Sequence, residues 1–416
     1  MESTKSYRVG VVALLFAGTF INAVDRASLS VAAPLIIKEF QLDTASMGIA
    51  LSAFFWLYAM LNAPIGALSD RLPTKSVLGW AVALWSLASA ATGLVRNLPQ
   101  LIACRLMVGV GESASFPVST KIIVENFPVT ERASALTIYT SGVRLGNAAT
   151  PLIMTYLIVN WDWRTAFFVT GVGSLLWCIV WYFTFTDRAA AQRGPVKEKI
   201  RVPWKAFLTN RATLGIILTK FFQDYLLYLF LTWVPAYLVL ERGFSIVKMG
   251  VFASLPWIAG TIAQALSGIL SDWLIKKGVS VNASRKGVQV GLQCMAATVI
   301  GVGFIDDPMW AVGLLTFAVA GESAAGGLIW AIMAEAAPPR LSGTLGGVMN
   351  SCGALAGILS PIMTGVLVKV TGSFQLALIV GGCMILISAL SVLFIIPELK
   401  PMVLEGLPEA DAEAKG

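Results

Sequence analysis

Two similar stretches, GALSDRLPTK at residues 66–75 and GILSDWLIKK at residues 268–277, lie 202 residues apart, and each follows a long apolar segment. Three further pairs occur in the same order at offsets of 208 to 210 residues: GESA at 111–114 and 321–324, the turns at Arg132 and Arg340, and Pro151 with Pro361. Four matches at a nearly constant offset predict a duplicated unit of helices, an arrangement common in membrane transporters.

The composition shows what surrounds these helices. Of 416 residues, 57% are hydrophobic and 13% are charged, and the mean hydropathy is +0.78. A soluble protein carries about a quarter charged residues. Runs of about 20 apolar residues, each long enough to cross a hydrocarbon core of about 30 Å, recur along the chain. These values exclude a soluble enzyme, a nucleic-acid-binding domain and a secreted disulfide scaffold, and they predict an all-α membrane protein.

Apolar segments separated by charged or turn-rich breaks predict twelve transmembrane helices. They lie near residues 9–36, 46–69, 76–95, 98–124, 132–159, 163–186, 211–239, 246–273, 284–304, 308–335, 340–369 and 372–396. The longest polar interruption divides them into two sets of six. We therefore expect an N-terminal bundle (1–186), a cytoplasmic linker (187–210), a C-terminal bundle (211–397) and a cytoplasmic tail (398–416).

Charge placement orients these helices. With both termini in the cytoplasm, nineteen of the 30 Lys and Arg residues lie on the inner side and six on the outer side, as the positive-inside rule requires. The net charge of +7 then needs no nucleic-acid partner. No small-residue cleavage site follows the first apolar segment, so we expect a retained helix. The expected location is a bacterial cytoplasmic (inner) membrane.

Cysteine and histidine usage limits the chemistry. The five cysteines are far apart and lie in apolar stretches, and the chain has no histidine. No spacing fits a metal site, and nothing indicates a bound cofactor. Proton chemistry is therefore expected to rest on carboxylates.

The GxLSDRxxxK pattern at 66–75 and its second copy resemble the signature of the major facilitator superfamily. The resemblance implies two six-helix bundles that work by alternating access, usually in a monomer. An acid beside cations can latch helix ends, so Asp70, Arg71 and Asp272 are expected to act in gating.

A narrower resemblance covers most of the chain. NAVDRASLS at 22–30, RLMVGVGE at 105–112 and TWVP at 232–235 are similar to the anion:cation symporter family. Its bacterial members include proton-coupled importers of galactonate, glucarate, hexuronates and other organic acids.

Nine ionisable residues lie inside the predicted spans: Asp25, Arg26, Arg105, Glu112, Lys121, Arg144, Lys220, Asp224 and Glu322. Each costs about 2.5–3.5 kcal/mol at the centre of a membrane helix, so they must face one another or a wet cavity. Lys121 fits a side chain that reaches the membrane interface. The roles of Lys121, Asp224 and Glu322 are left open.

Helical spacing predicts a site on the first and fourth spans. Arg105 and Glu112 are two turns apart on one face, and Asn22, Asp25 and Arg26 are expected to share a side. Arginine captures a carboxylate through its planar fork. An acid released from its cation is more easily protonated. We expect Arg26 and Arg105 to hold the acid group of the substrate, and Asp25 and Glu112 to carry coupling protons; the resemblance implies the same roles.

Other positions of this chain match the substrate-contacting residues of the family only in part. Tyr58, Trp330 and Asn350 match positions that contact sugar acids. Three sites depart from that pattern, because Ala23 replaces a tyrosine, Val143 with Arg144 replaces a Gln-Tyr pair, and Lys220 stands near a polar glutamine. Fewer hydroxyl and amide partners and more cations favour a smaller or more apolar acid, and we count Arg144 and Lys220 among the substrate-binding residues.

The sequence therefore predicts proton-coupled import of a small organic anion, either a carboxylate with two acidic groups or an aromatic or sulfonated acid. A proton-coupled sugar-acid importer and an anion exchanger or uniporter without protons stay open as alternatives. A drug/proton antiporter is disfavoured by the cationic cluster, a non-transporting sensor by the lack of an added domain, and an enzyme by the lack of a catalytic motif.

Overall fold

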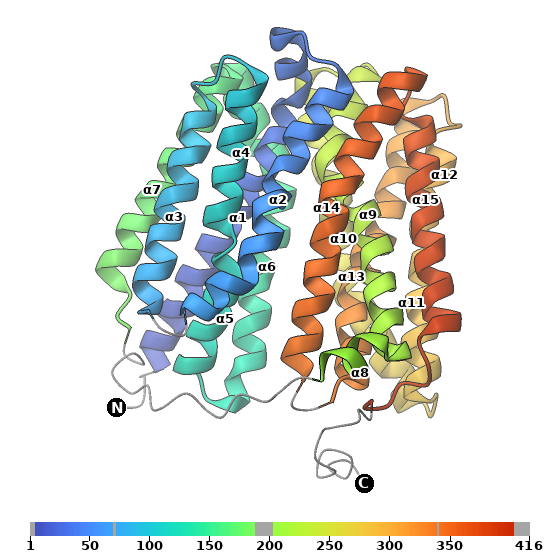
Figure 1. The fold of residues 1–416 in the computed structure, drawn as a ribbon. Helices are drawn as coiled ribbons and strands as arrows, with labels where there is room; N and C mark the ends of the chain where they lie inside the picture. The colour runs from blue at the N-terminus through green and yellow to red at the C-terminus, as the bar shows by residue number, and fades with distance from the viewer. Residues whose placement is uncertain (1–4, 70–71, 188–202, 339–340, 403–416) are drawn as a thin grey trace. The chain divides into compact units, whose positions relative to one another are not determined.

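The structure is a computed structural model, and it describes residues 5–69, 72–187, 203–338 and 341–402. Every regular element in these ranges is a helix (Figure 1). The helices are α1 (Lys5–Phe40), α2 (Thr44–Ser69), α3 (Thr74–Thr92), α4 (Leu98–Glu112), α5 (Ser115–Asn126), α6 (Val129–Asn160), α7 (Trp163–Thr184), α8 (Trp204–Thr209), α9 (Arg211–Leu240), α10 (Ile246–Lys276), α11 (Val281–Ala297), α12 (Val299–Val302), α13 (Pro308–Ala336), α14 (Ser342–Thr371) and α15 (Gln375–Leu390), which ends in a π-helical turn, Ser391–Ile395. The all-α prediction is confirmed.

Nine helices within the described residues are long and apolar enough to cross a membrane. The predicted spans near 76–95, 132–159 and 284–304 are also helical, as α3, α6 and α11 with α12, although they are not among these nine. The predicted span 98–124 forms two helices, α4 and α5, which are separated only at Ser113 and Ala114. This break follows Gly109 and Gly111. Glycine loses more conformational entropy in a helix than other residues do, so the two weaken a continuous helix here.

Side-chain caps set several helix boundaries. The side chains of Asn97, Asp162 and Asp307 accept hydrogen bonds from backbone N–H groups in the first turns of α4, α7 and α13. Proline is the second residue of α4 and the first residue of α13, where its missing N–H costs nothing. These caps explain why each helix starts where the polar break ends.

The contacts divide the chain into two compact units. Unit 1 comprises residues 1–196, 231–255 and 361–370, and unit 2 comprises residues 197–230, 256–360 and 371–416. In unit 1, α1 packs on α6 and α7, α3 packs on α4 and α7, and α2 packs on α4. In unit 2, α11 packs on α13 and α15. The bundle boundaries expected from the sequence stay a prediction, because these units are defined by contact alone.

Glycines bring the helices of unit 1 very close together. A Cβ on Gly109 of α4 would overlap the carbonyl oxygen of Phe54 in α2, and a Cβ on Gly142 of α6 would lie 2.6 Å from the carbonyl oxygen of Phe16 in α1. Small residues permit such backbone contact, which is how helices associate without a hydrophobic driving force in lipid.

Unit 1 also contains a contact between the start of α2 and the second half of α14. The Thr44 hydroxyl donates to the carbonyl of Gly365 at 2.8 Å. A Cβ on Gly48 would overlap the carbonyl oxygen of Pro361. The Lys369 ammonium lies 2.6 Å from the Asp43 carboxylate. We call this set of residues the α2–α14 seal.

A second contact in unit 1, between α6 and α10, mirrors the seal. A Cβ on Gly250 would overlap the Thr155 hydroxyl, which lies 3.5 Å from the carbonyl of Ile246. Gly250 follows Gly48 by 202 residues and Gly365 follows Thr155 by 210, the offsets of the sequence repeat. The duplication therefore places the same close contact twice in one unit.

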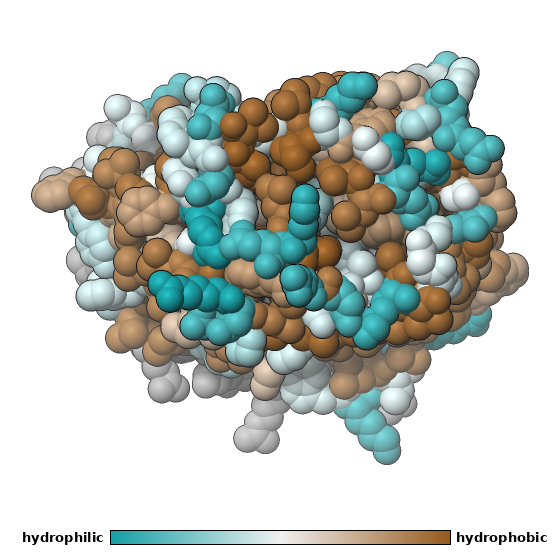
Figure 2. Space-filling view, turned by 90° about the horizontal axis from the view of Figure 1, so that it is seen from above, coloured by the Kyte–Doolittle hydropathy of each residue, from teal (hydrophilic) through white to brown (hydrophobic). Residues whose placement is uncertain are grey.

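Large apolar side chains are exposed along the helices, for example Trp80 (73%) in α3 and Phe183 (87%) in α7. Figure 2 shows hydrophilic and hydrophobic side chains interspersed on the face seen from above. Exposing this much apolar surface to water is unfavourable, so the surface fits one that is covered by lipid.

Candidate substrate and proton site

An ion pair between α1 and α4 lies at the centre of the predicted site. Both the Nε and the Nη2 groups of Arg26 donate to Glu112 Oε2, at 3.0 and 2.8 Å. The Nη2 group also donates to Asn22 Oδ1 at 3.2 Å. The Arg26 side chain is 18% exposed, whereas Glu112 is fully buried. The prediction that spans one and four bring these two residues together is thus met in the geometry.

The two carboxylate oxygens of Glu112 differ. Oε2 receives both bonds from Arg26, while Oε1 is buried and has no hydrogen-bond partner among the described residues. A buried acceptor without a donor is costly. Oε1 is therefore the atom at which a proton would relieve an unsatisfied group.

Two aromatic rings of α2 lie beside Arg26. Its guanidinium carbon is 4.9 Å from the ring centroid of Phe54 and 5.1 Å from that of Tyr58. The two rings stack on each other at 5.1 Å. Ring faces attract a cation, so they fix the position of the guanidinium. Tyr58, expected from the sequence, is brought to the site.

Arg105 is buried behind this pair, with 2% exposure. Its Nη2 group donates to the backbone carbonyl of Arg26 at 3.1 Å, and Nη1 lies 3.5 Å from the carbonyl of Asp25. These bonds attach α4 to α1. The geometry favours a positioning role for Arg105 over direct contact with a solute.

Asp25 does not share a side with Asn22 and Arg26, contrary to our expectation. Ser89 of α3 donates to its Oδ1 at 3.0 Å, and Ser174 of α7 donates to its Oδ2 at 2.6 Å. Residues 22 and 26 are four apart and differ by about 40° around the helix, whereas neighbours 25 and 26 differ by about 100°. Asp25 therefore lies buried between α1, α3 and α7.

The predicted substrate-binding residues of α9, α13 and α14 belong to unit 2. Lys220 is buried and pairs with Asp224 at 2.7 Å. The pair packs against α14, where a Cβ on Gly353 would overlap Asp224 Oδ2. Its two charges balance, so Lys220 adds no net positive charge there. Trp330 and Asn350 are half-buried on α13 and α14, and Arg144 is half-buried on α6 in unit 1.

Two of the predicted gating residues, Asp70 and Arg71, lie outside the described residues. The third, Asp272 at the end of α10, lies 2.8 Å from the Arg285 guanidinium of α11. Arg285 also donates to the Ser271 hydroxyl at 3.0 Å. The second SD motif therefore holds two helix ends together.

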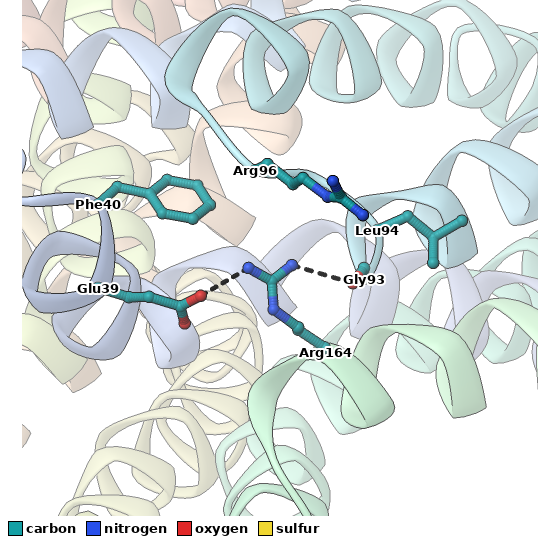
Figure 3. A pocket seen from close by; sticks show the side chains of 6 residues that line it. All are labelled: Glu39, Phe40, Gly93, Leu94, Arg96 and Arg164. Carbon is teal, nitrogen blue, oxygen red and sulfur yellow. Dashed lines mark hydrogen bonds and ion pairs between the residues drawn. The ribbon is translucent and has the colours of Figure 1, made fainter.

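A cavity of about 570 Å³ lies elsewhere in unit 1, where α1, α3 and α7 end or begin. In it Arg164 donates to Glu39 and to the carbonyl of Gly93 (Figure 3). Arg96 lines the same cavity. Arg164 therefore links the start of α7 to the end of α1 and to the segment after α3. This cavity holds none of the predicted coupling acids, and we do not assign the substrate to it.

No group of three or more Cys, Asp or Glu side chains that could hold a metal occurs within the residues that the structure describes. The five cysteines are all unpaired.

The sequence profile of the Major Facilitator Superfamily matches residues 15–361. The chain belongs to the major facilitator superfamily. It is accordingly a multi-pass membrane transporter, as the sequence resemblance indicated.

Individual relatives show which transporters of the superfamily this chain is similar to. This superfamily member is 32% identical to a probable galactarate/D-glucarate transporter of Escherichia coli K12, over 97% of each chain. It is 33% identical to a probable sulfoacetate transporter of Cupriavidus necator, over 95% of each chain. The prediction of a transporter similar to those of sugar acids and organic anions is confirmed.

A solved structure shares the fold. The inward-facing, occupied form of a bacterial homologue of the human lysosomal transporter Spinster matches with a TM-score of 0.82, 19% identity and coverage of 94% of this chain and 97% of that one. At this identity the match supports the major facilitator fold alone.

Several residues that shape the site carry little or no signal in the sequence. Ser89 and Ser174, which hold Asp25, look like ordinary small residues in apolar helices. The Asp43–Lys369 pair joins two helix ends from different repeats. The only available signal was the opposite charge of two groups at the ends of predicted spans.

Proposed function

We propose that this transporter imports a small organic anion with two acidic groups together with protons, as a monomer in the bacterial cytoplasmic membrane with both termini in the cytoplasm. The observation that carries the proposal is the state of Glu112. One of its oxygens holds Arg26 and the other is buried without a donor. The acid is thus placed to exchange a cation for a proton.

The coupling follows from competition for Arg26. A carboxylate or sulfonate of the substrate can take the two Arg26 N–H groups that now bond Glu112. Glu112, buried and released from its cation, then binds a proton far more readily. Anion and proton thereby favour each other's binding, which is the coupling free energy that symport requires. Arg105 holds the backbone of Arg26 in place during this exchange.

Asp25 is proposed as a second proton-binding acid. It is completely buried and accepts two hydroxyl hydrogen bonds. Serine hydroxyls can donate to a carboxylate or accept from a carboxylic acid. The pocket can therefore accommodate both protonation states without moving a helix.

The substrate class follows from the cations and the relatives. Two of the relatives are named for galactarate, glucarate and sulfoacetate, and each of these anions carries two acidic groups. Others of similar identity are named for D-galactonate and hexuronate, which carry one, so the preference for a diacid depends on the added cations. Arg26 is one candidate for an acidic group, and Arg144 is the other. Tyr58, Trp330 and Asn350 are proposed to contact the rest of the molecule. Lys220 enters this scheme only when substrate separates it from Asp224.

Alternating access requires one end to open while the other closes. We propose that the α2–α14 seal closes the outer end and that substrate passes only after it opens. Asp70 and Arg71, and Asp272 with Arg285, are proposed to fasten helix ends on the cytoplasmic side.

Proteoliposome uptake tests the function. Galactarate, sulfoacetate, galactonate and short dicarboxylates are supplied with and without an inward proton gradient. We expect accumulation of the diacids, and only with the gradient. Transport of galactonate with no transport of any diacid would contradict the substrate class, and equal uptake without the gradient would indicate an exchanger or uniporter.

A further inference from the structure

Unit 2 contains a buried polar network that the proposed function does not use. Three glutamines, Gln223 of α9 with Gln289 and Gln293 of α11, are fully buried. Gln289 Nε2 donates to Gln223 Oε1 at 3.0 Å, and Gln293 Nε2 lies 3.4 Å from the same oxygen. Gln293 Nε2 also donates to the Ser388 hydroxyl at 2.7 Å. We call these residues the glutamine network.

A carboxyl group lies at one end of this network. Glu322 of α13 is 1% exposed. A Cβ on Gly326 would lie 3.3 Å from Gln223 Nε2 and 3.7 Å from Glu322 Oε1. The amide and the carboxyl therefore border the same small space, which the missing side chain of Gly326 leaves open.

Several atoms of the network have no partner among the described residues. They are Gln223 Nε2, Gln289 Oε1 and Gln293 Oε1. Buried amide atoms are rarely left unsatisfied. The unmatched donor borders the space beside Glu322, and the unmatched acceptors belong to the two glutamines behind it.

We propose that Glu322 is a proton-binding site in unit 2, distinct from Arg26–Glu112, and that Gln223 positions it. The ionised carboxylate can accept from Gln223 Nε2. The protonated acid is a donor and needs an acceptor, which Gln223 provides by a 180° rotation of its amide. Its Nε2 then faces Gln289 and Gln293, whose oxygens can accept after their own rotations. A network of amides can thus satisfy both protonation states, which a fixed cation cannot do.

The sequence repeat supports the assignment. Glu322 follows Glu112 by 210 residues, within the repeated GESA stretch. Each repeat therefore places a buried carboxyl at the same point of its helix. In unit 1 the acid faces Arg26 of α1, whereas in unit 2 the space beside it is bordered by an amide of α9.

Other ionisable groups on the neighbouring helices of unit 2 have partners of their own. On α9, Lys220 pairs with Asp224. On α11, Arg285 pairs with Asp272, and Lys286 donates to the carbonyl of Ile396. On α13 itself, Glu335 is three turns or more from Glu322 and half-buried.

This inference rests on proton coupling, and its test separates the two claims. Purified protein in proteoliposomes, with the membrane potential clamped to zero, accumulates anion to a ratio set by the number of protons per anion. We expect Glu322→Gln to retain gradient-driven uptake but to lower the ratio by about tenfold per pH unit of gradient, the loss of one proton. Glu335→Gln, the same change on the same helix, should keep the wild-type ratio.

An unchanged ratio in Glu322→Gln would overturn the assignment, and so would sodium-driven accumulation at equal pH that this variant abolishes. Wild-type protein that shows no proton-driven accumulation would instead contradict the proposed function. If Glu322→Gln does not fold, Gln223→Leu provides the test. It removes the amide donor, so the pH dependence of uptake should move to higher pH, and an unmoved profile would contradict the role of Gln223.

Discussion

Lys369 of α14 and Asp43, which precedes α2, form a 2.6 Å ion pair that joins the two repeats of the chain. The Asp43 carboxylate also accepts from the backbone N–H of Ser46. The bond from Lys369, with that of Ser46, lowers the pKa of Asp43 to about 2. The pair lies outside the apolar part of the helices and is about half exposed.

Asp43→Asn should weaken the α2–α14 seal without changing the pH dependence of uptake. The lowered pKa means that the stabilisation by the pair is complete above the ordinary value of 3.8 and is lost only as pH falls through about 2. Between pH 5 and 8 Asp43 stays ionised. An exposed pair contributes about 0.2–1 kcal/mol, so we expect a less than about fivefold change in rate and a pH profile of unchanged shape. A displaced profile would contradict this.

Gly48→Ala should abolish uptake while the protein still folds. Its new Cβ would overlap the backbone oxygen of Pro361, which cannot rotate away. Gly173→Ala on α7 is the matched control, because nothing lies within 4 Å of that Cβ position. Initial uptake rates and thermal stability are compared for the two variants. Equal rates would show that the seal is not needed for transport.

Gly250→Ala should be milder, because its Cβ meets the side chain of Thr155. Adding Thr155→Gly removes those atoms and should restore uptake. The double variant then has alanine at position 250 and glycine at position 155, so the glycine of the α6–α10 contact moves from α10 to α6. A double variant as impaired as Gly250→Ala would argue against the mirrored contact.

Arg26→Lys should raise the KM for the anion by about 10- to 100-fold. A lysine keeps the charge but loses the planar fork that bonds Glu112 through two N–H groups. Arg96→Lys makes the same change in the 570 Å³ cavity and should leave the KM near wild type. The opposite pattern would place the substrate in that cavity.

The double variant Ser89→Ala, Ser174→Ala removes both hydroxyl donors of Asp25. A hydrogen bond to a charged group contributes about 1.5–3 kcal/mol, so the loss of these donors should destabilise the ionised form of Asp25. We expect the pH dependence of uptake to move upward by about one pH unit or more. Uptake profiled from pH 5 to 9 measures this, and a profile that stays in place would exclude Asp25 from proton coupling.

Much of this arrangement could be predicted from the sequence. The apolar runs predict the helices. Because a buried charge is costly without a partner, they also predict that Arg26 and Glu112 lie close to each other. The side chain of Asp25 lies elsewhere than its spacing predicts, because adjacent residues of a helix point about 100° apart and two serines donate to its carboxylate.

The missed features depend on packing between distant segments. Nothing in the periodicity of α2 or α14 indicates that Gly48 meets Pro361. Asp224, one helical turn from Lys220, balances its charge, so the expectation that Lys220 adds a cation to the site does not hold in the structure. The glutamine network likewise combines three helices, α9, α11 and α15.

The central claim is that Glu112 exchanges Arg26 for a proton when the anion binds. Glu112→Gln in proteoliposomes tests it most directly, because glutamine keeps the shape but cannot ionise. We predict that an inward proton gradient no longer drives accumulation, while exchange of labelled for unlabelled anion continues. Accumulation by Glu112→Gln at the wild-type ratio under the same gradient would contradict the account.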